Sequence, residues 1–231
     1  MTSELLSPPI IKICGVTSLD AALAATDSGA DMIGLVFVEK SPRAISADAA
    51  IALAQSVRER RDHPPRFVGL FVDADDAAIG VAAPALDGLQ CHGAETPARI
   101  AAIKETFKLP VMKALPVGAA ADLAAAEAFE GIADAFLFDA RPPKGAVVTG
   151  GHGVVFDWSV LRAYKGPTRF LLAGGLVPEN VARAIAALRG LPGFAGVDVS
   201  SGVESKRGVK DLNKIRAFTC TAAQAWDEPA F

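Results

Sequence analysis

Two side chains that can move protons stand at the ends of apolar runs far apart in the sequence. Residues 10–13 form a mostly apolar run that stops at Cys14, and residues 135–138 form another that stops at Asp139. A thiolate can take a proton from carbon and a carboxylic acid can donate one to oxygen, which together would be general acid–base catalysis. A lone cysteine is more often an inert core residue, and an aspartate here can instead cap a turn. The catalytic interpretation requires a fold that brings both groups to one face.

The neighbours of these residues follow the alternation of a strand, in which every second side chain shares a face. Lys12 and Cys14 would therefore share one face, and a lysine near the thiol would favour the thiolate. Gln90 and His92 would likewise share a face, while Cys91 would point the other way and pack as a small apolar residue. His92 could act as a base, or it could be a satisfied structural histidine.

Three further segments have the character of anion sites. Gly174 and Gly175 form one glycine-containing turn and residues 198–202 form a second, and backbone amides in such turns can bind phosphate. Arg43 follows another apolar run, and Pro42 stiffens its approach, so we expect Arg43 to clamp a carboxylate through two hydrogen bonds. The expected substrate-binding residues are Lys12, Arg43, Gln90, His92, Gly174, Gly175, Asp198, Ser200, Ser201 and Gly202.

The elements that must position these residues alternate regularly along the chain. Short apolar runs bounded by turn residues are typical of strands buried on both faces, and they cover residues 10–16, 32–37, 67–72, 88–92, 111–115, 135–139, 169–173 and 196–200. Ala-rich stretches with helical spacing lie between them, at residues 19–28, 47–60, 97–107, 119–129 and 179–188. Several helices have a capping residue at their start, namely Ser18, Ser46, Thr96 and Asp157.

This order predicts an α/β fold, a single (β/α)8 TIM barrel with eight parallel strands. A chain of 231 residues is close to the usual length of such a barrel. We expect one domain over residues 1–231, with an N-terminal extension at 1–9 and a weakly patterned tail at 219–231. Because the carboxyl ends of all barrel strands meet on one face, the residues named above would share one rim.

Composition excludes several classes of function. The chain has 23 basic and 26 acidic residues and a net charge of -3, without a basic stripe, so we expect no nucleic-acid partner. Its apolar runs are too short to span a bilayer. Its 3 cysteines contain no CxxC pair, which indicates a reducing compartment, and no cluster has metal-ligand spacing. We therefore expect a cytoplasmic enzyme, a monomer or homodimer, that acts on a small-molecule substrate without metal or cofactor.

A long segment rich in Gly and Pro, residues 140–156, follows the sixth predicted strand. Loops of this length on a compact domain are more often functional than idle. We interpret residues 150–153 within it as part of a lid.

Taken in order, these motifs resemble the phosphoribosylanthranilate isomerase family, barrel enzymes of tryptophan biosynthesis. The resemblance covers residues 12–218, and its strongest stretches are residues 12–17, 30–37, 40–43, 89–93, 137–139, 156–158, 172–176 and 196–204. Cys91 stands where the family usually has an aliphatic residue. His152 and Val154 stand in the lid, where a small hydroxyl residue and a lysine would be expected.

The resemblance implies an Amadori rearrangement of N-(5-phosphoribosyl)anthranilate to 1-(2-carboxyphenylamino)-1-deoxyribulose 5-phosphate, which needs no cofactor. The family's general base matches Cys14 and its general acid matches Asp139. Its carboxylate-binding arginine matches Arg43, and its phosphate loops match residues 174–175 and 201–202.

Two other functions remain to be compared with this one. The related isomerase of histidine biosynthesis uses two aspartates, whereas the first predicted strand here ends in Cys14. A barrel that binds ligand without turnover is the other alternative, and the presence of both Cys14 and Asp139 argues against it.

Overall fold

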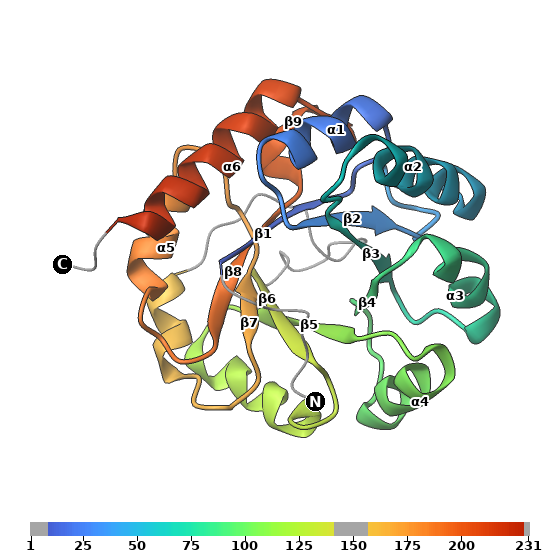
Figure 1. Cartoon of the computed structure of the whole chain (residues 1–231). Helices are drawn as coiled ribbons and strands as arrows, with labels where there is room; N and C mark the ends of the chain where they lie inside the picture. Colours follow the sequence, from blue (N-terminus) through green and yellow to red (C-terminus); the bar gives the residue numbers. More distant parts are fainter. Residues whose placement is uncertain (1–8, 141–156, 229–231) are drawn as a thin grey trace.

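The strands close into a parallel barrel, as the sequence predicts. The computed structural model describes residues 9–140 and 157–228, and within them eight strands follow one another in chain order around a closed ring (Figure 1). They are β1 (Ile10–Cys14), β2 (Met32–Val36), β3 (Arg66–Phe71), β4 (Gly88–Cys91), β5 (Val111–Val117), β6 (Ala135–Ala140), β7 (Phe170–Leu172) and β8 (Phe194–Val199). Every bound lies within two residues of the predicted one. The ring closes where β8 pairs with β1, which places the last strand beside the first.

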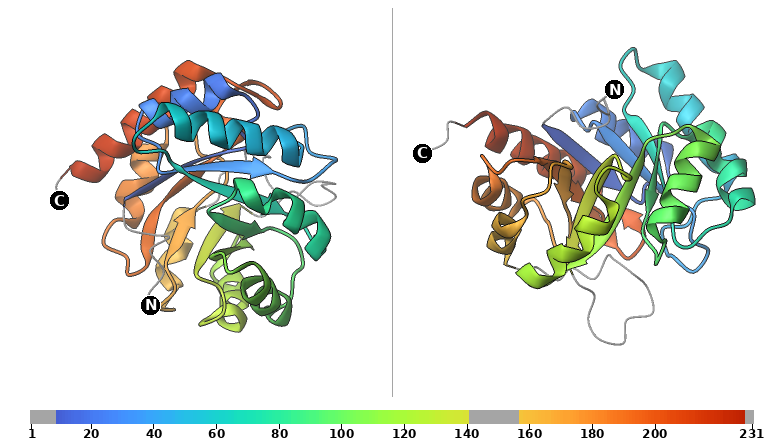
Figure 2. Two further views of the ribbon diagram at one scale, coloured as in Figure 1. Left: turned by 45° about the vertical axis from the view of Figure 1, so that its right-hand side comes forward. Right: turned by 90° about the horizontal axis from the view of Figure 1, so that it is seen from below.

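Helices form a layer around the outside of the strands (Figures 1 and 2). The α-helices are α1 (Leu19–Asp27), α2 (Ala47–Arg60), α3 (Asp76–Ala82), α4 (Pro97–Phe107), α5 (Val181–Leu188) and α6 (Leu212–Asp227). The 3-10 helices are η1 (Ala83–Ala85), η2 (Ala120–Phe129), η3 (Trp158–Ala163) and η4 (Ser201–Val203). Each predicted capping side chain accepts a hydrogen bond from a backbone N–H in the first turn of its helix; these are Ser18, Ser46, Thr96 and Asp157.

The structure corrects the sequence analysis at one element and adds two helices that it did not predict. The stretch predicted as a helix at residues 119–129 is the 3-10 helix η2, whose buried residues Leu123, Ala126 and Phe129 recur every third position, the period of a 3-10 helix. The short helix α3, capped by Asp75, follows β3 without having been predicted. The tail is helical as far as Asp227, because α6 packs against both α1 and α5 (Figure 1).

A small hairpin also follows β8 and η4. Its strands are β9 (Glu204–Lys206) and β10 (Val209–Lys210), which pair antiparallel. The hairpin lies just beyond the carboxyl end of β8, so it adds side chains to the rim where the predicted site lies.

Strand alternation separates the core into an inner and an outer cluster. Inside the barrel, a small cluster includes Ile10, Met32, Val68, Met112 and Leu137. The residues between them face outward and join the larger cluster under the helices. This inner layer closes the barrel beneath the rim, so the site above it has a floor of packed side chains.

None of the helices in residues 9–140 and 157–228 is long and apolar enough to cross a membrane.

Candidate active site

A cavity of about 730 Å³, including its open mouth, lies at the carboxyl ends of the strands. Cys14 from β1 and Asp139 from β6 both line it, so the fold brings the thiol and the carboxyl group to one opening. The other predicted site residues on its wall are Arg43, Gln90, His92, Gly174, Gly175, Asp198, Ser200, Ser201 and Gly202.

Lys12 is the predicted binding residue that the structure places elsewhere. Its side chain is fully buried inside the barrel, is not part of the cavity wall, and donates a hydrogen bond of 2.6 Å from Nζ to Asp198 Oδ1. Burial opposes the charge of Lys12, but the carboxylate of Asp198 and the nearby thiol together raise its pKa above the ordinary value. Lys12 is therefore a buried cation beneath the site rather than a group that a substrate could reach.

The sequence analysis expected Lys12 to favour the thiolate of Cys14, but the surroundings of Cys14 favour the thiol. Burial raises the pKa of the Cys14 thiol above its ordinary value, and the attraction of Lys12 opposes this shift only in part. Asp198 raises the pKa further, and Lys210 lowers it. The lysine favours the thiolate, as expected, but desolvation is the larger effect and the net shift is toward the thiol.

Asp139 is buried at the end of β6 and faces a histidine. Its Oδ2 lies 3.5 Å from His92 Nε2, and the Nε2 amide of Gln90 is 3.1 Å from His92 Nδ1. When Gln90 donates to Nδ1, the ring proton is on Nε2 and faces Asp139. The other amide atom, Gln90 Oε1, is buried and has no hydrogen-bond partner among the described residues. A ligand hydroxyl or amine in the cavity would satisfy it.

The loop after β7 lies close to the acid. Gly174 has a positive φ of 87°, and a Cβ built there would be 2.4 Å from the backbone nitrogen of Ala140 and 2.8 Å from Asp139 Oδ1. Only glycine fits a turn that is both left-handed and this close to its neighbour. Asn180 holds the same loop by donating from Nδ2 to the carbonyl of Gly175 at 3.0 Å.

Arg43 lines the same cavity, but its guanidinium already binds a carboxylate of the protein. Nε donates to Glu204 Oε1 at 2.6 Å and Nη2 donates to Glu204 Oε2 at 3.0 Å. Both side chains are almost completely buried. These bonds use two of the five guanidinium N–H donors, so a second anion can still be bound from the cavity side.

Sequence reasoning did not assign two parts of this site. An apolar wall is formed by Val36, Val38, Leu70 and Val72, whose spacing of two at the ends of adjacent strands could have indicated it. Glu204 and Lys210 come from the hairpin after β8, and no local pattern connects them with Arg43. The predicted lid, residues 150–153, lies outside the described residues together with His152 and Val154.

Comparison with known proteins identifies relatives over nearly the whole chain. The family model described as N-(5'phosphoribosyl)anthranilate (PRA) isomerase matches residues 11–221. The N-(5'-phosphoribosyl)anthranilate isomerase of Rhodospirillum rubrum is 49% identical over 215 residues, which cover 92% of this chain and 97% of that protein.

Solved structures of the same kind superpose on the barrel. The crystal structure of phosphoribosyl anthranilate isomerase from Thermotoga maritima has a TM-score of 0.79 and 34% sequence identity, covering 93% of this chain and 98% of that chain. A related structure in complex with reduced 1-(o-carboxyphenylamino)-1-deoxyribulose 5-phosphate has a TM-score of 0.76 and 33% identity, with coverage of 93% and 98%.

Proposed function

This chain belongs to the phosphoribosylanthranilate isomerase family of tryptophan biosynthesis, and we propose that it isomerises N-(5'-phosphoribosyl)anthranilate with Cys14 as general base and Asp139 as general acid. The single observation that carries this assignment is that both groups line one cavity from β1 and β6. Proton removal from carbon and proton donation to oxygen need two groups on different sides of one sugar, and this cavity supplies them.

The proposed reaction begins with Asp139. Its carboxylic acid donates a proton to the furanose ring oxygen as the bond between that oxygen and C1' breaks, and the anthranilate nitrogen supplies electrons to form a protonated imine. The imine acidifies the C2' hydrogen, which the thiolate of Cys14 removes. The resulting enolamine then takes up a proton at C1' and loses the hydroxyl proton at C2', giving the ketone without a change in oxidation state of the protein.

His92 and Gln90 support the acid in this proposal. A hydrogen bond from Gln90 to Nδ1 would leave the ring proton of His92 on Nε2, 3.5 Å from the Asp139 carboxyl group, where it can help to orient that group. The unpartnered Oε1 of Gln90 would accept a hydrogen bond from a substrate hydroxyl or amine.

The walls of the cavity match the two ends of the substrate. The backbone of the loops after β7 and β8, at residues 174–175 and 200–202, is the proposed phosphate site. At the other end, the apolar wall from β2 and β3 suits an aromatic ring, and Arg43 beside it suits the ring's carboxylate. The ligand in the solved structure of a related isomerase, reduced 1-(o-carboxyphenylamino)-1-deoxyribulose 5-phosphate, has both a carboxylate on its ring and a phosphate.

Turnover by substituted enzymes tests the assignment. The decrease of substrate fluorescence is followed with wild type, Cys14→Ser and Asp139→Asn, and each substitution should lower kcat by about 10²–10⁴-fold because one proton transfer loses its catalyst. Substitution of the exposed Cys220 by Ser is the matched control and should not change the rate. A wild-type rate for Asp139→Asn would exclude this aspartate as the acid.

A further inference from the structure

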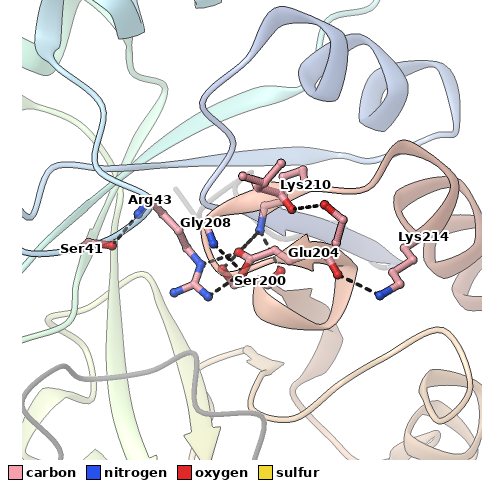
Figure 3. Close-up of polar contacts among 9 residues, drawn as sticks. Ser41, Arg43, Ser200, Glu204, Gly208, Lys210 and Lys214 are labelled. Atoms are coloured by element: carbon pink, nitrogen blue, oxygen red, sulfur yellow. Dashed lines mark hydrogen bonds and ion pairs between the residues drawn. The ribbon is translucent and has the colours of Figure 1, made fainter.

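Glu204 is a carboxylate near the rim that accepts hydrogen bonds from three residues, and the reaction above does not use it. Its Oε1 accepts from Arg43 Nε at 2.6 Å and from Lys210 Nζ at 3.2 Å. Its Oε2 accepts from Arg43 Nη2 and from the backbone nitrogen of Gly208, each at 3.0 Å. Figure 3 shows these donors around the one carboxylate, with Arg43 reaching it from a different segment of the chain.

Glu204 cannot contact a substrate directly. It is buried and does not line the cavity, whereas Arg43 does. The carboxylate therefore lies behind the guanidinium, on the side away from the cavity. Any influence of Glu204 on a ligand must pass through the groups that it holds.

We propose that Glu204 is a positioning residue that fixes the Arg43 guanidinium and thereby sets the enzyme's preference for a substrate that carries a carboxylate on its aromatic ring. The two parallel hydrogen bonds fix the plane of the guanidinium, which a single contact would leave free to rotate. The remaining N–H donors of Arg43 then already face the cavity, so that binding the ligand does not have to immobilise a freely rotating side chain. This inference rests on the proposed function, because it takes Arg43 as the group that binds the ligand carboxylate.

Glu204 is itself held in its charged form. Burial opposes its ionisation, but the hydrogen bond from Arg43, the nearby charge of Lys210 and the amide of Gly208 lower its pKa below the ordinary value. Lys210 also donates from Nζ to the carbonyl of Ser200 at 2.7 Å. The hairpin is thus tied both to the loop after β2 and to the loop after β8.

Ligand affinity provides the test. The probes are reduced 1-(o-carboxyphenylamino)-1-deoxyribulose 5-phosphate and the same compound without the carboxyl group. The ratio of their Kd values is measured by calorimetry for wild type, Glu204→Gln, Arg43→Ala and the double variant. Glu204→Gln should reduce the wild-type preference for the carboxylated probe by about 10-fold or more, since a charged hydrogen bond loses its geometry. The double variant should show no further reduction beyond that of Arg43→Ala.

A matched control separates this effect from general damage. Asp87 accepts from Arg58 Nη2 at 3.0 and 2.9 Å and from the backbone nitrogen of Phe67 at 2.8 Å, and it lies just before β4, at the opposite end of the barrel. Asp87→Asn therefore removes an arginine–carboxylate pair without touching the cavity, and the ratio should keep its wild-type value. If Glu204→Gln fails to fold, Glu204→Asp takes its place, since it keeps the charge but shortens the reach.

The outcomes distinguish the two proposals. A folded Glu204→Gln that keeps the wild-type ratio, or that weakens both probes equally, overturns the role of Glu204 while Arg43→Ala still loses the preference. If Arg43→Ala itself keeps the preference, the proposed carboxylate contact is wrong, and the role of Glu204 is overturned with it.

Discussion

The thiol of Cys14 lies among charges of both signs inside the barrel, and its protonation depends on their balance. Lys12 stabilises the thiolate, whereas Asp198 and burial both destabilise it. Burial has the largest effect of the three. The ion pair of Lys12 and Asp198 is satisfied internally at 2.6 Å. A base with a raised pKa is a strong base that is seldom in its active form at neutral pH, so its use depends on the cation beside it.

Removal of that cation should change the pH dependence of turnover. In the wild type, kcat/KM should rise with pH as the Cys14 thiolate forms, because only the thiolate can accept the proton. Lys12→Met should raise the pKa of Cys14 further and move this rise to higher pH, since the largest opposing attraction is lost. The measurement is kcat/KM from pH 6 to 10. A rise at the wild-type pH, or at lower pH, would mean that Lys12 does not stabilise the base.

Two further variants guard that measurement. Lys12→Met leaves Asp198 buried without its partner, which can destabilise the fold, so Lys12→Met combined with Asp198→Asn removes both charges. In this double variant kcat/KM should also rise at a higher pH than in the wild type, because the effect of Lys12 on the pKa of Cys14 exceeds that of Asp198. Lys104→Met, which breaks a pair with Asp134 away from the cavity, should leave the profile unchanged.

Between elements, the position of the thiol depends on the contact of β1 with β2. Cys14 pairs with Gly34 in the register of these strands. A Cβ built on Gly34 would be 2.7 Å from Cys14 Sγ and 3.0 Å from its Cα. The absence of a side chain at Gly34 therefore provides the space that the thiol occupies.

Gly34→Ala should displace the thiol and slow the reaction. Because Sγ must move by several tenths of an ångström or more, kcat/KM should fall by about 10–10²-fold, and stability should fall by about 1–3 kcal/mol. Both are measured, by turnover and by urea denaturation. Gly80→Ala is the control, since a Cβ there would first meet Phe107 at 3.8 Å. It should keep full activity and add about 0.5–1 kcal/mol of stability. Equal activities of the two variants would show that the Gly34 contact does not position the base.

For the whole molecule, the sequence predicts the strands and helices, whose patterns are local. It does not predict contacts between residues that only the closed barrel brings together. Alternation of apolar runs and capped helices was enough to predict the closed barrel, and the strand ends were enough to place Cys14 and Asp139 on one cavity. Arg43 and Glu204 are 161 residues apart, and no local spacing connects them. The sequence analysis assigned no element to the tail, because its apolar positions are explained only by packing against α1 and α5.

The outward-facing thiol of Cys91 should make the barrel less stable as the pH becomes alkaline. It packs in the cluster under the helices, as strand alternation predicted, and burial raises its pKa to about 12 from an ordinary value of 9.0. Above the lower value the unfolded chain loses the thiol proton and the folded chain does not, so stability is fully present below pH 9 and falls as pH rises toward 12. The slope is about 1.4 kcal/mol per pH unit.

Cys91→Val should therefore reduce the alkaline loss of stability. Between pH 8 and pH 10.5 the unfolding free energy of the wild type should include a decrease of about 2 kcal/mol from this thiol, and the variant should lack it. Urea denaturation at both pH values, with a reductant present, gives the two differences. Comparing differences cancels any change in packing caused by valine, since that change is the same at both pH values. Equal losses in wild type and variant would mean that Cys91 ionises as readily in the folded barrel as in the unfolded chain.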